Sequence, residues 1–444
     1  MSHQDKDDLR TPLAELKELL APIEQVALGA IGRHGNAILD LHGIAILARL
    51  TFGWNQQQTL GDRFDDAPTA TKRGFSGILL AGSFQALMVV LRACGDALAR
   101  TISLHLLNHL STQPNRLLFG RPTFAVDGSQ FAVPRTAKNL AAFAAASRKA
   151  KSSYKKPADY AKAKTTQIAV SLCLHQGTGF PAFWNLGGSA DSERGLLLDM
   201  LDLLPKNSRL VMDAYYFGFD FWNCLIDHGC TFVVRAGKSI DLLGQLSSPR
   251  ESEVSWRSGL LLAAKCHRRG SLADRAELGV CDGWSQKDVP ADERIDARGR
   301  PVGKAVCPAV GSGSFFRTVK QSYERAKMLS RTPENAKQEI QWTLLGIWMA
   351  LTEGAQSIPA GRRISPVRVL RVICKLVTAV ARHSSSKMNL HQQLEGCVIA
   401  DESSRQSSKN SDHYPRKKRK RQTGEPNVHP ISDELQKLAI TRMT

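Results

Sequence analysis

The stretch Leu210-Val211-Met212-Asp213-Ala214-Tyr215 decides the fold class of this chain. Its apolar run predicts a buried strand that ends just before the carboxylate of Asp213. A helical pattern over 219–228 and a second apolar run over 232–235 come next. The segment therefore predicts a strand, a helix and a strand in succession, and with them a mixed α/β sheet.

A second aspartate, Asp127, lies in Phe124-Ala125-Val126-Asp127-Gly128-Ser129, again after an apolar run. We expect both aspartates at strand ends, where open sheets keep their active sites. Two Asp side chains holding a pair of Mg²⁺ ions are the usual protein contribution to phosphodiester chemistry, because hard cations take oxygen ligands. Such a site normally needs a third acid, and neither stretch supplies one.

The composition favours a polyanionic partner. The chain has 444 residues, 42% of them hydrophobic, and 60 Lys and Arg against 41 Asp and Glu give a net charge of +19. Nucleic acid is the leading candidate, with an anionic membrane as the alternative. No apolar run reaches the roughly 18 residues of a membrane span, and residues 1–10 are polar, so we predict a cytoplasmic protein without a membrane partner. The nine cysteines stand singly, which favours reduced thiols over a zinc site.

The periodicity changes twice along the chain. Helical spacing runs from 13 to 110, strands begin at 123, and the polar tail follows the last apolar helices. The basic run 414–421 is either a solvated tail or a DNA attachment segment. The Lys-rich stretch 135–164 is either a solvated surface or a phosphate contact.

Strong helical signals return at residue 315. Phe315 to Gln321 begins a helix-like stretch, and Thr332-Pro333-Glu334 predicts an N-cap followed by Pro at the first helical position. Residues 339–351 then predict a strongly apolar helix.

Taken in order, these segments resemble the DDE transposases of bacterial insertion sequences, in the family-4 group. The resemblance is carried by short motifs that follow one another in the family's order: Val126-Asp127-Gly128-Ser129, Ser192-Glu193-Arg194, 212–220, 316–321 and 330–334. It implies an RNase H-like (retroviral-integrase-like) catalytic core over 116–355 with a β-rich insertion at about 236–300. A helical N-terminal domain, 1–115, would bind transposon ends, and 356–444 would form a helical segment and a flexible basic tail.

The resemblance also implies site residues and partners. Asp127 and Asp213 carry over as catalytic metal ligands for two Mg²⁺ ions, or Mn²⁺ in their place. Lys320 ends the family's signature of Tyr, Arg, Glu and Lys and would contact phosphate, with Arg317 one helical turn before it. The implied function is cleavage of insertion-sequence ends and strand transfer into target DNA. The implied partners are double-stranded DNA, both terminal inverted repeats and target, and a second copy of the chain in a homodimer on DNA.

The chain departs from the signature before Lys320. Counting back, the signature needs Glu at 313, Arg at 309 and Tyr at 306, whereas the chain has Gly313, Ala309 and Val306. Glu324 lies too far along the helix to replace the missing acid. We therefore expect a chain that binds DNA and cuts it poorly or not at all. Reading the codons across about 288–315 one base later can restore all three signature residues, which suggests a pair of compensating frameshifts.

Two other classes remain open. A noncatalytic DNA-binding remnant of a transposase would keep the fold without the third acid. A nuclease or resolvase with an RNase H-like core would share the two aspartates but would lack the signature at 316–321.

Overall fold

The structure is a computed structural model in which the placed residues fall into separate stretches. Side chains and backbone are described for residues 10–26, 40–54, 59–75, 78–112, 117–118, 120–143, 166–213, 215–216, 218–234, 315–357, 364–382, 384 and 387–398, with the side chains of Pro22 and Phe219 excepted. The backbone alone is described for 241–245, 250–252, 256–258, 261–263 and 427–429.

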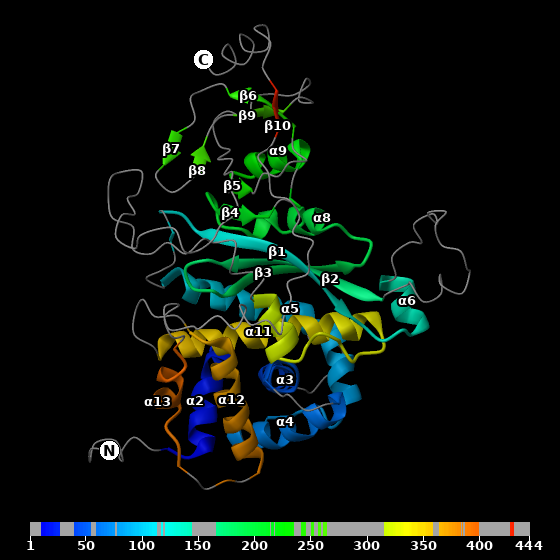
Figure 1. Ribbon diagram of the computed structural model, residues 1–444. Coiled ribbons are helices and arrows are strands. Elements are labelled where there is room, and N and C mark those ends of the chain that lie inside the picture. Colours follow the sequence, from blue (N-terminus) through cyan, green and yellow to red (C-terminus); the bar gives the residue numbers. More distant parts are fainter. Residues whose placement is uncertain are drawn as a thin grey trace, which may run out of the picture.

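A five-stranded mixed sheet forms the middle of the molecule (Figure 1). Its strands, in spatial order, are β3 (Pro181–Gly188), β2 (Gln167–His175), β1 (Thr123–Ala132), β4 (Arg209–Met212) and β5 (Thr231–Val234). β1, β2 and β3 pair antiparallel, whereas β4 lies parallel to both β1 and β5. The predicted α/β class is confirmed at the level of a mixed sheet covered by helices.

The unit around Asp213 is confirmed. β4 and β5 flank α9 (Phe219–Asp227), and their pairing runs from Arg209 opposite Thr231 to Met212 opposite Val234. Both strands are short and apolar, as expected where a parallel sheet is buried on both faces. β3 has no counterpart among the predicted strands.

The expectation that both aspartates end a strand is correct for Asp213 and wrong for Asp127. Asp213 directly follows β4, but Asp127 lies in the middle of β1, opposite Leu172 of β2. β1 continues because its antiparallel ladder with β2 extends to Ala132, although its parallel ladder with β4 stops at Ala125 opposite Val211. The two ladders end at different places. The apolar run before Asp127 marks the end of the ladder with β4 and does not indicate where the ladder with β2 ends.

Helices account for most of the remaining described residues. They are α2 (Pro12–Glu24), α3 (Leu41–Ala48), η1 (Arg49–Trp54), α4 (Leu60–Gly74), α5 (Phe84–Thr112), α6 (Ala137–Phe143), α8 (Glu193–Leu198), η2 (Leu201–Leu203), α9, η4 (Thr318–Ser322), α11 (Pro333–Gln356), α12 (Pro366–Ala381) and α13 (Leu390–Glu395). The described part of 13–110 is helical, as predicted. In α11, Thr332 is the N-cap and Pro333 the first helical residue, and the Thr332 hydroxyl accepts a hydrogen bond from Asn335 N at 3.4 Å.

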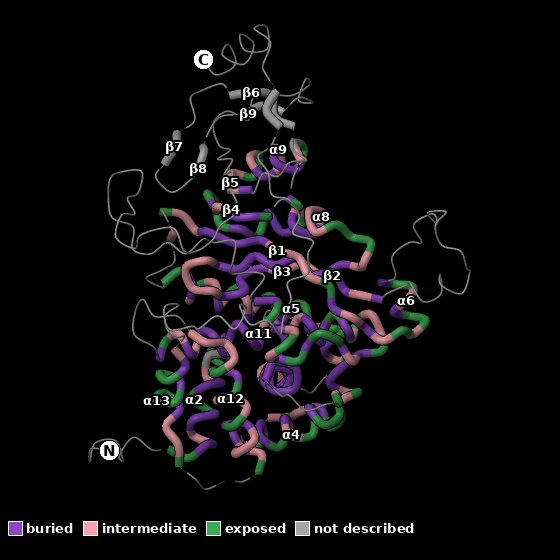
Figure 2. Tube along the Cα trace, in the orientation of Figure 1, coloured by how far each residue is buried: buried purple, intermediate pink, exposed green. Residues whose placement is uncertain are grey.

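The sheet lies between two helical layers (Figure 1). α11 covers one face, where Trp348 packs edge-on against Trp184 of β3 with ring centroids 6.3 Å apart. α8 and α9 lie on the other face. α2, α4 and α12 pack against one another on the far side of α11, so buried residues run without interruption from the sheet into this helical half (Figure 2).

α11 and η1 cross at unusually short range. Gly53 and Gly346 face each other so closely that a Cβ on Gly346 would stand 2.4 Å from Gly53 Cα. Trp54 Nε1 donates a hydrogen bond to the Gly346 carbonyl at 3.0 Å next to this crossing. Two glycines are therefore needed where the backbones meet.

The predicted β-rich insertion is described only in part, and several other predicted segments lie outside the described residues. Short strands β6 (Asp241–Gln245), β7 (Arg250–Ser252), β8 (Trp256–Ser258) and β9 (Leu261–Ala263) fall at the start of the predicted β-rich insertion, and β10 (Asn427–His429) pairs with β6. The rest of the insertion, the Lys-rich segment from 144 to 165 and the basic run at 414–421 are not among the described residues. The same holds for 306–313, where the third acid is missing.

Two findings concern the described residues as a whole. Six of the nine cysteines fall in the described stretches, and none of those six forms a disulfide. No helix found in these stretches combines the length and the apolar character that crossing a membrane demands.

Candidate active site

Asp127 and Asp213 lie where β1 and β4 separate. The parallel ladder between these strands ends at Ala125 opposite Val211, two residues before each aspartate. The Asp127 carboxylate accepts a hydrogen bond from Gly128 N at 2.9 Å, and the Asp213 carboxylate accepts one from Tyr215 N at 2.8 Å. Asp213 is exposed and Asp127 is partly buried. The structure thus brings the two predicted ligands to neighbouring strands of one sheet.

A third carboxylate, Glu193, reaches the same place from α8. Ser192 is the N-cap of α8, and its hydroxyl accepts a hydrogen bond from Gly195 N at 3.0 Å, which sets Glu193 in the first turn. The Glu193 side chain lies directly over Gly128, where an added Cβ would stand 2.0 Å from Glu193 Cδ. Any side chain larger than glycine's at 128 would push Glu193 away from β1.

The pKa of the Glu193 carboxyl group reflects the electrostatics of the site. Burial raises the pKa of its carboxyl group, and the negative charges of Asp127 and Asp213 raise it further, while the neighbouring Tyr216 hydroxyl opposes the rise. Nearby like charges disfavour ionisation in this way. Asp127 of β1, Glu193 of α8 and Asp213 after β4 therefore lie close enough to interact electrostatically.

Tyr216 forms the buried floor beside Glu193. Its side chain is fully buried, and burial, followed by the charges of Glu193 and Asp127, raises the pKa of its phenol far above the usual range. The phenol is therefore a permanently protonated group next to Glu193.

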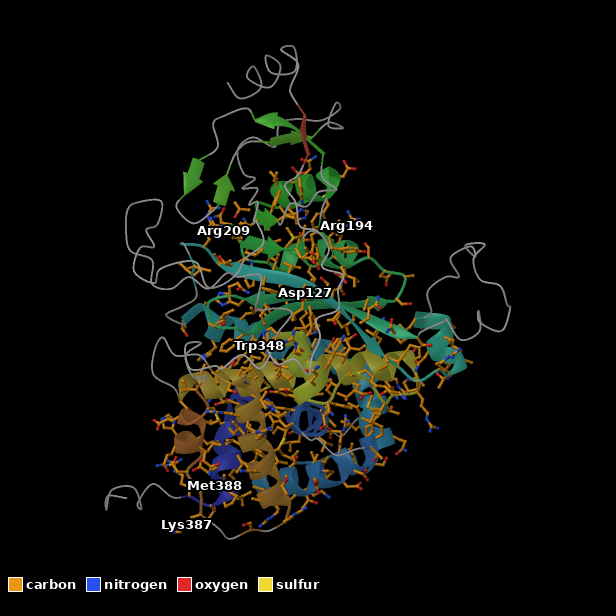
Figure 3. All side chains as sticks on the ribbon, viewed as in Figure 1. Asp127, Arg194, Arg209, Trp348, Lys387 and Met388 are labelled. Atoms are coloured by element: carbon orange, nitrogen blue, oxygen red, sulfur yellow. The ribbon has the colours of Figure 1, made fainter. Side chains whose placement is uncertain are left out.

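The acids approach from opposite faces of the sheet. Phe131, four residues after Asp127 on β1, packs edge-on against Phe316 at 6.1 Å between ring centroids, so Asp127 also faces the side that holds η4. Gly128 points the other way, toward α8 and Glu193. Figure 3 shows Asp127 at the middle of the sheet, with Arg194 on α8 and Trp348 on α11.

Lys320 stands beside Asp127. Its ammonium group lies 4.9 Å from the centroid of the Phe131 ring, on the same face of β1 as Asp127. Burial lowers the pKa of Lys320, and the charge of Asp127 opposes that shift. The predicted phosphate contact is thus within electrostatic range of a predicted metal ligand.

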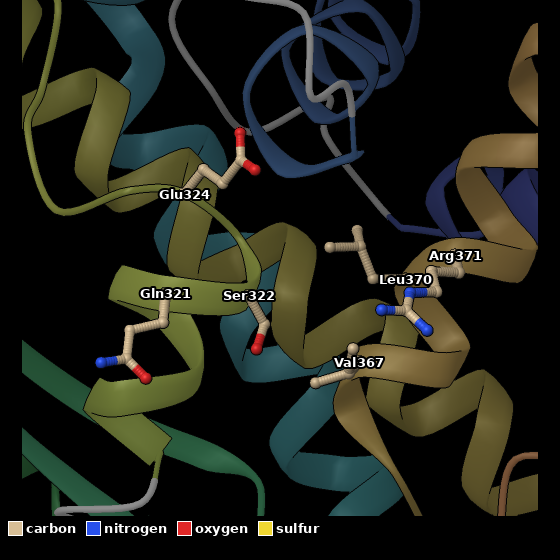
Figure 4. A pocket seen from close by; sticks show the side chains of 6 residues that line it. All are labelled: Gln321, Ser322, Glu324, Val367, Leu370 and Arg371. Atoms are coloured by element: carbon tan, nitrogen blue, oxygen red, sulfur yellow. The ribbon is translucent and has the colours of Figure 1, made fainter. Parts of the chain in front are cut away.

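Arg317 and Glu324 do not lie beside Asp127 as Lys320 does. Arg317 is exposed at the N-cap of η4, a π-helix whose wider turn differs from the α-helical spacing assumed for Arg317 and Lys320. Glu324 follows η4 with φ of +54° and lines a cavity of about 300 Å³ with Arg371 of α12 (Figure 4). The structure gathers Asp127, Asp213 and Lys320, and it places Glu324 at that cavity.

The donor chemistry fits a divalent cation only in part. Carboxylate oxygens on adjacent strands suit Mg²⁺ or Mn²⁺. In the described stretches, however, no three side chains of His, Cys, Asp or Glu stand close enough together to hold a metal ion. Glu193 does not complete such a set because it arrives from the other face, and position 313 lies outside those stretches.

Comparison with known proteins identifies the class of the central segment. Residues 118–277 match the family model of the transposase DDE domain, a match that covers less than half of the chain. It confirms the resemblance to DDE transposases over the segment that holds Asp127, Glu193 and Asp213, and it leaves the family-4 group untested. Transposases of this kind generally use divalent metal ions.

The other comparisons add little. No curated protein matches the chain. Two solved chains match, and one is a piggyBac transposase in a synaptic complex with hairpin DNA, determined by cryo-electron microscopy. That chain is 10% identical, with 90% of this chain and 88% of that chain covered and a TM-score of 0.34. A score of this size carries no argument about the fold.

Sequence reasoning missed the position of Glu193 and of Tyr216. Ser192-Glu193-Arg194 carried part of the resemblance, but nothing in the sequence placed Glu193 against a residue 65 positions earlier. The available signal was Gly128, because a glycine within a strand often marks a place where another group approaches closely.

Proposed function

We propose that this protein is a DNA transposase in which Asp127 and Asp213 hold divalent cations for cleavage of transposon ends and strand transfer into target DNA. The observation that carries the proposal is the pair of aspartates on adjacent parallel strands within a segment that matches the transposase DDE domain. The strand order β3-β2-β1-β4-β5, with β2 alone antiparallel to the other four strands, supports an RNase H-like core.

Each residue of the candidate site has a role in this proposal. Asp127 and Asp213 supply oxygen ligands from two strands, and cations bound there would activate the attacking oxygen and neutralise the leaving one. Lys320 contacts a DNA phosphate close to Asp127, and Arg317 contacts the backbone further out. Tyr216 and Gly128 keep Glu193 in place. The protein acts on double-stranded DNA as a homodimer, as the resemblance implies.

We also propose that catalysis is weak in this chain. The signature position for the third acid holds Gly313, which has no side chain to coordinate a cation. Loss of one ligand leaves metal binding weaker and less well positioned. The alternative is a noncatalytic DNA-binding remnant, and the same glycine is the observation that favours it.

Nicking of supercoiled plasmid by the purified chain with Mn²⁺ tests the proposal. We expect slow formation of nicked circles that requires the metal. Asp127→Asn and Asp213→Asn should each reduce the rate by about 10- to 100-fold or more, since even outer partners of metal ligands cost that much. Asp202→Asn is the matched control, because it removes an equally charged, exposed side chain near β4.

The outcomes separate the classes. Nicking that survives both substitutions would overturn the assignment of the site. Binding of DNA without nicking under any metal would favour the noncatalytic remnant.

A further inference from the structure

α12 differs from the other described helices in its charge. It carries Arg368, Arg371 and Lys375 and no carboxylate, and Arg382 is its C-cap. The other described helices of comparable length, such as α4 and α11, mix acids with bases or carry acids alone. In a chain of net charge +19, this helix presents the cations without their usual partners.

Two of the cations are placed where they do not help the helix. A cation stabilises the C-terminal turn and is unfavourable near the N-terminus, where the helix dipole is already positive. Arg368 and Arg371 nevertheless lie in the N-terminal part of α12, and its first turn has no acid, whereas Arg382 lies at the C-cap, where the dipole favours a cation. Helix stability therefore does not explain Arg368 and Arg371.

Arg368 has a structural task. Its guanidinium donates hydrogen bonds to the Gly396 and Val398 carbonyls, both at 3.2 Å, and so fixes the end of α13. Among the described residues, the side chains of Arg371, Lys375 and Arg382 make no such hydrogen bond, and none of the three has a carboxylate within ion-pair distance. We call these three residues the α12 basic stripe.

The stripe has one exposed face. Offsets of four and eleven residues bring the three side chains to the same side of a helix with about 3.6 residues per turn. All three are exposed, whereas Val369, Ile373 and other apolar residues bury the opposite face against α2, α4 and α11. The stripe extends for roughly 16 Å along the axis, long enough to follow several phosphates of one DNA strand.

The stripe continues from the candidate active site. η4 carries Lys320 beside Asp127 and packs against the start of α12, where the Tyr323 hydroxyl donates a hydrogen bond to the Pro366 carbonyl at 3.4 Å. Gln321 and Ser322 of η4 line the cavity shared with Arg371 (Figure 4). Glu324 lies in this cavity too, so the cavity is a poor anion site and the exposed stripe is the binding surface.

We propose that the α12 basic stripe binds the phosphate backbone of duplex DNA that extends away from Asp127 and Asp213. The inference rests on the proposed function for the position of the scissile phosphate. Contact of this kind positions the duplex without reading its sequence, because phosphates carry no sequence information.

Fluorescence anisotropy of the full chain with a mixed-sequence duplex of roughly 30 base pairs, about three helical turns, tests the inference in EDTA. The test variant replaces Arg371, Lys375 and Arg382 together by Gln, which keeps helix propensity. The control replaces Arg92, Arg100 and Lys206 together by Gln, which removes the same charge from other exposed positions. Thermal melting of both variants checks that each is folded.

We expect the stripe variant to bind roughly tenfold more weakly or worse and to lose about 0.9 of salt slope for each phosphate contact removed, while the control changes little. Equal weakening in both variants would overturn the stripe and leave the nicking result untouched. Absence of duplex binding by the wild-type chain would overturn both the stripe and the proposed function. Loss of binding to anionic vesicles with unchanged duplex binding would identify a membrane contact and overturn the stripe.

Discussion

Two glutamates, Glu339 and Glu193, show how differently the two halves of the molecule use a buried negative charge. Glu339 of α11 is fully buried and accepts hydrogen bonds from Leu329 N at 3.0 Å and Ser330 N at 2.9 Å. Arg63 of α4 lies 3.8 Å from its carboxylate. Glu193 lies instead within electrostatic range of Asp127 and Asp213, and its pKa is raised by burial and by their charges.

The difference separates structure from function. The Glu339 carboxylate pairs with Arg63 and accepts hydrogen bonds from two backbone N–H groups, so the cluster holds α4, α11 and the preceding loop together. Around Glu193 the neighbours oppose ionisation, and such an arrangement is destabilising unless a cation or a ligand compensates it. Acids with perturbed pKa values cluster at functional sites.

Removal of the Glu339 charge should have the largest effect on stability. Glu339→Gln removes the buried ion pair with Arg63 and weakens the hydrogen bonds from two backbone N–H groups. We expect a loss of about 3–5 kcal/mol in the free energy of unfolding, the usual cost of breaking a buried pair. Urea denaturation measures it.

Glu334→Gln is the control on the same helix, because Glu334 is exposed in the first turn of α11. Its cost should stay below about 1 kcal/mol, the size of a helix-dipole effect. Similar losses at both positions would contradict the view of Glu339 as the centre of a structural cluster.

The glycine crossing beneath the sheet should be the next most sensitive site. Gly346→Ala would place a methyl group 2.4 Å from Gly53 Cα, which is backbone and cannot rotate away. We expect a loss of about 1–3 kcal/mol, as for overpacked cores. Gly82→Ala, where nothing lies within 4 Å, should change the free energy of unfolding by less than about 1 kcal/mol in either direction.

The pH dependence of stability should distinguish Glu193 with the smallest effect. A raised pKa in the folded state means that folding favours the protonated form, so stability falls as pH rises from the unfolded value through the folded one. Glu193→Gln lacks this loss. The variant should therefore gain on the wild-type chain as the pH rises above about 4, the ordinary range of a glutamate, by less than about 1 kcal/mol. If the stability of the two chains changed with pH in the same way, Asp127 and Asp213 would not raise the pKa of Glu193.

The sequence predicted those parts of the molecule that depend on local pattern. The strand before Asp213, helix α9 and the Thr332-Pro333 start of α11 follow from apolar runs and capping chemistry. The sequence did not predict the strand whose formation depends on pairing with a neighbouring strand. β3 begins with Pro181 and ends in two glycines, which outweigh the strand-favouring Phe183 and Trp184 between them, and its pairing at the edge beside β2 makes it a strand.

The site was predicted only as far as its motifs reached. Asp127 and Asp213 stand on adjacent strands as the resemblance implies, and their role as ligands stays a prediction. The π-helical turn at η4 changes the faces of Arg317 and Lys320, and no residue type in Thr318–Ser322 announces it. Glu193 entered the site through tertiary packing over Gly128, which no spacing rule in the chain could indicate.

The measurement that tests the central claim most directly is the effect of Mn²⁺ on the thermal unfolding of the full chain and of Asp127→Asn, Asp213→Asn and Asp202→Asn. A cation that binds only the folded state raises the melting temperature. We predict that Mn²⁺ stabilises the wild-type chain and the Asp202 variant, and that this stabilisation is lost in both variants of the paired aspartates. Equal stabilisation of all four chains would contradict a metal site at Asp127 and Asp213.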